Sequence, residues 1–199
     1  MKTVTMILCA ALIFAAVPVR ADDLPAVEEV LARFVAAVGG QDALRQVDVR
    51  RCRGTIVQDL TWTDPTHQET SFVVTADTAG TVYYAESDDW ADADPEAGAG
   101  LRSKLRWLFH PRYALAMQEF FPDLEVMEVQ EREGRQVVVL CSPDQKFAYY
   151  ALYFDMETGL LNHIGYHNQV TDYRPVDGVL YPHRAVFGRK GGHTTYVIQ

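Results

Sequence analysis

Nine short runs rich in valine, isoleucine, tyrosine, phenylalanine and threonine constrain the fold more than any other feature of this sequence. They occupy residues 51–60, 69–78, 80–87, 124–131, 135–142, 146–155, 160–170, 179–188 and 193–199. Residues of these types favour extended backbone. Tight-turn pairs separate several runs, namely Glu133-Gly134, Thr158-Gly159, Asp177-Gly178 and Gly191-Gly192. Strands joined by tight turns pair antiparallel, so the sequence predicts an antiparallel meander that forms a curved sheet or open barrel.

A helix is predicted before the first strand. In DDLPAVEEVLARFVAAVGG, Asp22 to Gly40, apolar residues recur at steps of three and four, at Leu24, Val27, Val30, Leu31, Phe34, Val35 and Val38. Asp22 can cap the helix, Pro25 suits its first turn, and Gly39-Gly40 would end it. We expect one amphipathic helix of about four turns, followed by a shorter helical turn at Gln41–Val47.

One segment interrupts the meander between the third and fourth strands. Residues 101–121 contain Leu101, Leu105, Leu108 and Phe109, which lie on one face of a helix, and Pro111, which breaks or kinks it. The preceding stretch, residues 86–100, is acidic and contains glycine, which predicts a mobile loop. The chain is therefore α+β, with a helical insertion in mid-sheet.

The first residues predict a secretory signal peptide. Lys2 precedes an apolar run of twelve residues, Met6 to Val17, and Val19-Arg20-Ala21 offers small residues for cleavage. Twelve residues reach only about 18 Å as a helix, too short for a bilayer core of about 30 Å. A short membrane anchor is the alternative. We expect a signal peptide at residues 1–21 and a single domain at residues 22–199.

Charge and cysteine content exclude several classes of protein. The chain has 27 acidic and 18 basic residues, a formal charge of −9. Nucleic-acid binding needs a basic face, so we expect no nucleic-acid partner. After the signal peptide only Cys52 and Cys141 remain. Their spacing matches no zinc or disulfide framework, which leaves two alternatives, a disulfide between them or two buried free thiols.

Metal and catalytic motifs are weak. His163 and His167 form an HxxxH pair, but on a strand their side chains would lie about 13 Å apart, too far for one metal ion. The acidic loop has Ala97 where a calcium-binding EF-hand loop needs glycine and Ser103 where it needs glutamate; a weak ion site is the remaining alternative. No nucleophile elbow or phosphate-binding loop occurs. We therefore expect no catalytic residue, metal or cofactor, and no enzyme.

The stretch DYRPVDGVLYPHRAV, Asp172 to Val186, brings together many polar residues. Asp177-Gly178 lies between two alternating runs, which is the strongest short-range signal for a hairpin. His183 and Arg184 then point to opposite faces of one strand. The stretch is a hairpin and not a catalytic cluster.

The insertion is also basic, with Arg102, Lys104, Arg106 and Arg112 close to Trp107, Leu108 and Phe109. Such a segment could meet anionic lipid head groups or a lipidated partner. The alternative is an ordinary lid helix whose apolar side faces inward and whose charges are solvated.

Three stretches resemble the outer-membrane lipoprotein-sorting, or LolA/LolB-like, superfamily. They are FVAAVGGQDALRQVDVRRCRGTIV, YFDMETGLL and DYRPVDGVLYPHRAV. The resemblance implies a half-open, strongly curved antiparallel β-sheet, an unclosed barrel, with an N-terminal helix and a mid-chain helical lid on the concave side. It also implies a periplasmic location and an apolar cavity that holds acyl chains.

We therefore expect a periplasmic, non-enzymatic carrier for an acyl-bearing ligand, a lipid or lipoprotein, that is a monomer and transiently meets an envelope membrane protein. The candidate wall and lid residues are Trp107, Leu108, Phe109, Phe120, Phe121, Tyr149, Tyr153 and Phe154. Both faces of the predicted strand at residues 146–155 are apolar, so one must be covered by helices and the other can be a partner interface. The alternatives are a protein-interaction or envelope-sensing module, whose cavity would be filled by its own side chains, and a hydrolase or metal-dependent enzyme.

Overall fold

A computed structural model describes residues 24–60, 66–189 and 191–199. The predicted signal peptide, residues 1–21, lies outside these ranges. Within them, no helix has both the length and the apolar character needed to cross a membrane. The chain is α+β, as the sequence predicts.

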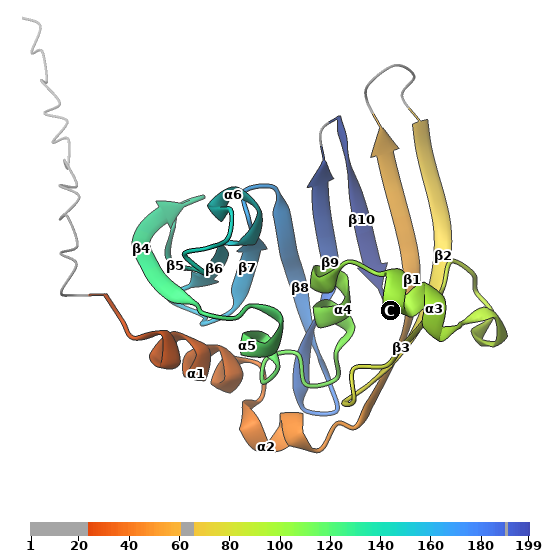
Figure 1. The fold of residues 1–199 in the computed structure, drawn as a ribbon, viewed down its shortest axis with the longest axis horizontal. Helices are drawn as coiled ribbons and strands as arrows, with labels where there is room; N and C mark the ends of the chain where they lie inside the picture. The colour runs from red at the N-terminus through yellow and green to blue at the C-terminus, as the bar shows by residue number, and fades with distance from the viewer. Residues whose placement is uncertain (1–23, 61–65, 190) are drawn as a thin grey trace, which may run out of the picture.

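The structure is dominated by one antiparallel sheet of ten strands (Figure 1). The strands are β1 (Val49–Leu60), β2 (Thr66–Asp77), β3 (Val82–Ala85), β4 (Glu125–Arg132), β5 (Arg135–Cys141), β6 (Leu152–Asp155), β7 (Leu161–Ile164), β8 (Asn168–Val176), β9 (Val179–Arg189) and β10 (Gly192–Ile198). Their order is β3-β2-β1-β10-β9-β8-β7-β6-β5-β4. The edge strands β3 and β4 do not pair with each other in the described ranges, so the curved sheet is an unclosed barrel.

At two of the four turn pairs that the sequence marks, the pair itself forms the two-residue turn of a hairpin. Asp177 and Gly178 have φ angles of 49° and 83° and join β8 to β9, where Val176 pairs with Val179. Glu133 and Gly134, with φ angles of 53° and 76°, join β4 to β5 in the same way. Two successive positive φ angles give the turn whose twist matches that of the strands. The predicted hairpin at Asp177-Gly178 is confirmed.

In the described part of the chain, seven short helices accompany the sheet. They are α1 (Val27–Ala37), α2 (Gly40–Arg45), a 3₁₀ helix (Trp90–Asp92), α3 (Pro95–Gly100), α4 (Ser103–Phe109), α5 (Met117–Phe120) and α6 (Phe147–Tyr150). In Figure 1, α1, α4 and α5 lie within the curve of the sheet. Helix α1 is shorter than predicted because Leu24 precedes proline, a position that disfavours helical backbone, and Ala26 is extended.

Two predicted strands and the predicted mobile loop are wrong. Residues 146–155 form α6 and then β6, so the expected alternation of faces does not extend through α6. Residues 160–170 form β7 and the start of β8, because Gly165 turns the chain with a φ of 66°. His163 is therefore buried on β7 and His167 is exposed in the turn. Residues 86–100 contain the 3₁₀ helix and α3, which Asp89 and Asp94 cap.

The main apolar core lies between the concave face of the sheet and α1, α4 and α5. The sheet contributes fully or almost fully buried side chains to it, among them Ile56, Phe72, Val74, Leu140, Phe154 and Ile198. A second, smaller cluster on the convex face consists of Val137, Val139, Cys141, Ala151 and Tyr153. Cys52 belongs to the first cluster and Cys141 to the second, and both are free thiols. Of the two alternatives for these cysteines, burial as free thiols is confirmed.

Candidate functional site

The insertion of residues 101–121, which we call the lid, lies across the concave face of the sheet. Its helix α4 places Leu105, Leu108 and Phe109 at steps of three and four, and it ends before Pro111, which cannot continue it. The side chains of Trp107, Leu108, Phe109, Tyr113, Met117 and Phe121 are all at most 2% exposed. The aromatic side of α4 thus faces inward, and the insertion has the arrangement of a lid helix.

Aromatic contacts tie the lid to α1 and to the sheet. The ring of Tyr113 lies 5.7 Å from Phe34 of α1 and 5.5 Å from Tyr181 of β9, measured between centroids. Phe109 lies 5.8 Å from Phe72 of β2. Each such pair contributes about 0.5–1.5 kcal/mol beyond area burial. The lid therefore packs against both α1 and the concave face of the sheet.

A buried arginine anchors the centre of the lid. Arg50 of β1 is 7% exposed, and its Nη1 donates to the Leu108 carbonyl at 2.6 Å. Its guanidinium lies 4.1 Å from the centroid of the Tyr181 ring, in cation–π contact. None of the ion pairs recorded among the described residues includes Arg50. Arg50 therefore joins strand β1 of the sheet to the backbone of the lid through the Leu108 carbonyl.

Two tyrosine hydroxyls reinforce this link. Tyr181 donates from β9 to the Pro111 carbonyl at 2.7 Å, and Tyr113 donates from the lid to the Leu180 carbonyl at 2.6 Å. Burial raises the pKa of both tyrosines above the ordinary value. Both hydroxyls therefore stay protonated and act as donors.

His110 lies at the C-terminal end of α4 and is buried in the lid. Its Nδ1 accepts a hydrogen bond from the Arg112 amide at 3.1 Å, and its ring packs 5.9 Å from Phe120. Burial, together with Arg112, lowers the His110 pKa, while Glu119 and Asp77 oppose this. The folded state therefore favours neutral His110, which keeps Nδ1 free to accept.

The pH dependence of stability follows from this lowered pKa. Above the ordinary pKa of about 6.5, His110 is neutral in both states; below it, the unfolded chain binds the proton more readily. Stability should fall as pH drops from neutral, with His110 contributing at most about 1.4 kcal/mol per pH unit. When the free energy of unfolding is measured by urea at several pH values, it should fall less steeply with decreasing pH in His110→Gln than in the wild type. His163, whose pKa is also lowered by burial, keeps part of the slope. An unchanged slope would exclude His110 as its source.

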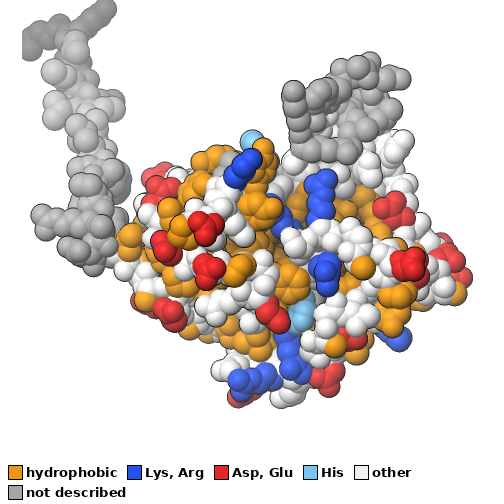
Figure 2. All heavy atoms as spheres, in the orientation of Figure 1, with side chains coloured by type: hydrophobic (Ala, Val, Ile, Leu, Met, Phe, Trp, Pro, Cys, Tyr) orange, Lys and Arg blue, Asp and Glu red, His pale blue; other side chains and the backbone are white. Residues whose placement is uncertain are grey.

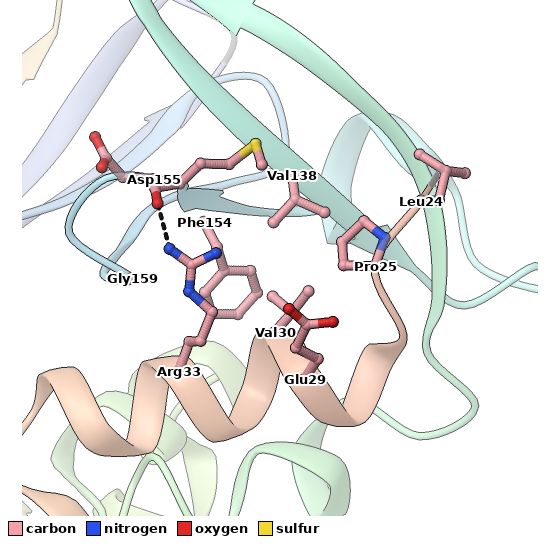
Figure 3. A pocket seen from close by; sticks show the side chains of 10 residues that line it. Leu24, Pro25, Glu29, Val30, Arg33, Val138, Phe154, Asp155 and Gly159 are labelled. Atoms are coloured by element: carbon pink, nitrogen blue, oxygen red, sulfur yellow. Dashed lines mark hydrogen bonds between the residues drawn. The ribbon is translucent and has the colours of Figure 1, made fainter. Parts of the chain in front are cut away.

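A cavity of about 330 Å³ opens between the start of α1, strands β5 and β6 and the turn after β6, and none of its lining residues belongs to the lid (Figure 3). Its apolar walls are Leu24, Pro25, Val30, Val138, Phe154 and Met156. Glu29, Arg33 and Asp155 add polar groups, and Arg33 donates from Nη2 to the Met156 carbonyl. The cavity is amphipathic and at the small end of ligand sites.

Asp155 belongs to the structure of this cavity wall. Its carboxylate is buried and accepts from Arg135 at 3.0 Å and from the Thr158 amide at 2.7 Å. Although burial opposes the change, these hydrogen bonds lower the Asp155 pKa. Asp155 thus holds the β6–β7 turn and has its acceptors occupied.

The predicted site residues fall into three places. Trp107, Leu108, Phe109, Phe121 and Phe154 lie together in the main core, and partly buried Phe120 packs against it. Tyr153 points to the other face of β6, into the second cluster, and Tyr149 is 57% exposed on α6. The structure brings six of the eight together. The sequence reasoning missed Arg50 and Arg33, because no local pattern marks their distant backbone partners.

Comparison with known proteins finds structural similarity only. No protein-family model and no curated protein sequence matches this chain. A LolA superfamily protein from Nitrosomonas europaea is 9% identical, with 88% of this chain and 92% of that chain covered and a TM-score of 0.46. A DUF1329 family protein from Desulfovibrio piger is 9% identical, with 87% and 91% covered and a TM-score of 0.46.

A chain of the MucA/MucB complex of Pseudomonas aeruginosa is 16% identical, with 86% of this chain and 56% of that chain covered and a TM-score of 0.25. All three TM-scores are below 0.5, so these similarities carry no functional argument, and the function must be argued from the residues of this chain. One of these solved structures belongs to the superfamily that the sequence motifs resemble.

Proposed function

We propose that this chain is a periplasmic, non-enzymatic carrier that holds one acyl-bearing ligand, a lipid or a lipoprotein, between the sheet and the lid. The observation that carries the proposal is the lid itself. The lid, which contains α4 and α5, packs its buried aromatic side chains against the apolar face of the sheet. A separate cavity of about 330 Å³ lies between α1, β5 and β6 and shares Phe154 with the core under the lid. Displacing the lid would present that apolar face to a ligand.

The energetics favour an exchange of lid for ligand. Burying an acyl chain contributes about 0.8 kcal/mol per methylene group. In the closed state the lid side chains Trp107 and Phe109 are 0% exposed, so they already occupy this apolar environment. An entering acyl chain replaces the contacts of the lid with its own contacts to the sheet. Because one set of apolar contacts replaces another, the closed state and the ligand-bound state differ little in free energy, and the ligand can be released. We propose Trp107, Leu108, Phe109, Phe121 and Phe154 as the ligand contacts, with Phe120 at their rim.

Arg33 gives the small cavity a cationic edge. It lies one helical turn after Glu29 on α1, and both side chains line the cavity, as Figure 3 shows. An acyl chain in this cavity would leave its polar end near these two groups. The arrangement suits an amphiphile better than a simple hydrocarbon.

The second candidate function is a protein-interaction or envelope-sensing module. It is favoured by the closed state, because the concave face is filled by the side chains of the protein itself, as this alternative predicts. In that case the lid never leaves the sheet, and no ligand enters.

The test is native mass spectrometry of the mature protein purified from a bacterial periplasm, followed by lipid extraction and by uptake of added fatty acid. Phe109→Ala and Tyr153→Ala form a matched pair, because each removes a ring that is 0% exposed, but only Phe109 lies in the lid. We expect a retained acyl species that Phe109→Ala loses and Tyr153→Ala keeps. A clean apo mass with no uptake would contradict the carrier and favour the interaction module.

A further inference from the structure

An exposed group of aromatic rings lies on α6 and in the β7–β8 turn, outside the lining of the cavity beside α1. In the described ranges, Tyr149, Tyr150 and Tyr166 are 57%, 36% and 47% exposed, and we call them the tyrosine patch. The first two lie on α6 and the third in the β7–β8 turn. The partly buried ring of Phe147 lies 5.9 Å from Tyr166 and joins the two segments. The two segments that carry the patch therefore lie side by side.

Two basic residues lie next to α6. Lys104 of α4 donates from Nζ to the Tyr149 carbonyl, and its Nζ lies 4.8 Å from the centroid of the Tyr150 ring. Lys146 is exposed directly before α6. Figure 2 shows hydrophobic and basic side chains together at the end of the molecule where Figure 1 places α6. Such a grouping is notable in a chain of net charge −9.

We propose that the tyrosine patch, with Lys104 and Lys146, is a docking surface for an anionic lipid bilayer. Tyrosine has an apolar ring and a polar tip, which suits the boundary between acyl chains and head groups. Lysine side chains beside it can reach lipid phosphates. Three rings offer far less area than the roughly 1,000 Å² that a specific protein interface buries, whereas a bilayer accepts a few rings independently.

The patch is mechanically joined to the lid, because Lys104 belongs to α4. At an anionic surface, lipid phosphates compete with the Tyr149 carbonyl for the Lys104 ammonium group. Docking therefore removes one contact that holds α4 in place. This consequence, but not the docking itself, rests on the proposed carrier function.

Docking is tested by flotation of the mature protein with phosphatidylcholine vesicles and with vesicles that also contain phosphatidylglycerol. We expect the protein to float with the anionic vesicles, and Lys146→Gln to lower its partitioning roughly fivefold. The triple variant Tyr149→Ser, Tyr150→Ser, Tyr166→Ser should lose flotation. The matched control is Tyr83→Ser, because Tyr83 is 42% exposed on the distant edge strand β3 and should float like the wild type.

Three results would overturn docking: equal flotation of the triple variant and the wild type, equal flotation with both vesicle types, or a wild-type dimer in sedimentation that the triple variant disperses. The last result would assign the patch to a second copy of the chain. Retention of an acyl species, measured by native mass spectrometry without vesicles, tests the carrier function independently of docking. A protein that floats but retains no acyl species keeps the docking surface and loses the carrier function.

Discussion

Trp107→Ala is expected to lower the free energy of unfolding by about 3–5 kcal/mol and to abolish retention of an acyl ligand. Trp107 is 0% exposed, and its ring lies 5.5 Å from Tyr113 and 5.7 Å from Phe121. Its Nε1 also donates to the Tyr113 carbonyl at 2.8 Å. The substitution removes these contacts and leaves a cavity in the middle of the lid. Urea unfolding monitored by circular dichroism measures the loss.

Trp90→Ala is the matched control. Trp90 is only partly buried in the 3₁₀ helix, and its recorded ring contact is a cation–π pair with Arg53 at 5.9 Å. An exposed cation–π pair contributes about 0.5–1 kcal/mol, so this variant should lose far less stability. Equal losses in the two variants would contradict a central role for Trp107 in closing the lid.

Local patterns in the sequence were sufficient where structure depends on near neighbours. The Asp177-Gly178 pair requires two positive φ angles, which only a few residue types accept, so its hairpin could be predicted. The lid could be predicted as well, because its apolar spacing is helical and Pro111 ends the helix. The same reasoning failed at residues 146–155, since a short aromatic run fits a strand or one helical turn equally well.

The site depends on contacts that no local pattern contains. In the sequence, Arg50 is one of several arginines at the start of a strand and has no distinguishing pattern. Its hydrogen-bond partner is the Leu108 carbonyl, 58 residues away along the chain. Tyr153 and Phe154 are neighbours in the sequence but lie on opposite faces of the sheet, in different clusters. Which face is concave is decided by the curvature of the whole sheet. The wall residues could therefore be proposed from the sequence, but not assigned to one face.

Arg50→Met is expected to loosen the lid while leaving the sheet intact. Methionine fills a similar volume without charge, but the buried Leu108 carbonyl loses its donor, which costs about 1–3 kcal/mol. The cation–π contact with Tyr181 is lost as well. Because these contacts join the lid to the sheet, the cost falls on the closed state. Hydrogen exchange of amides 103–116 should therefore accelerate by roughly 5- to 150-fold, the factor to which 1–3 kcal/mol corresponds.

Arg174→Met provides the control, because Arg174 is exposed and pairs only locally with Asp172 at 2.6 Å. It should leave exchange in the lid unchanged. Arg50→Lys should fall between the wild type and Arg50→Met, since lysine can donate one hydrogen bond but cannot lie flat on the Tyr181 ring. If Arg50→Met accelerated exchange throughout the sheet as much as in residues 103–116, Arg50 would stabilise the whole fold and would not set the position of the lid.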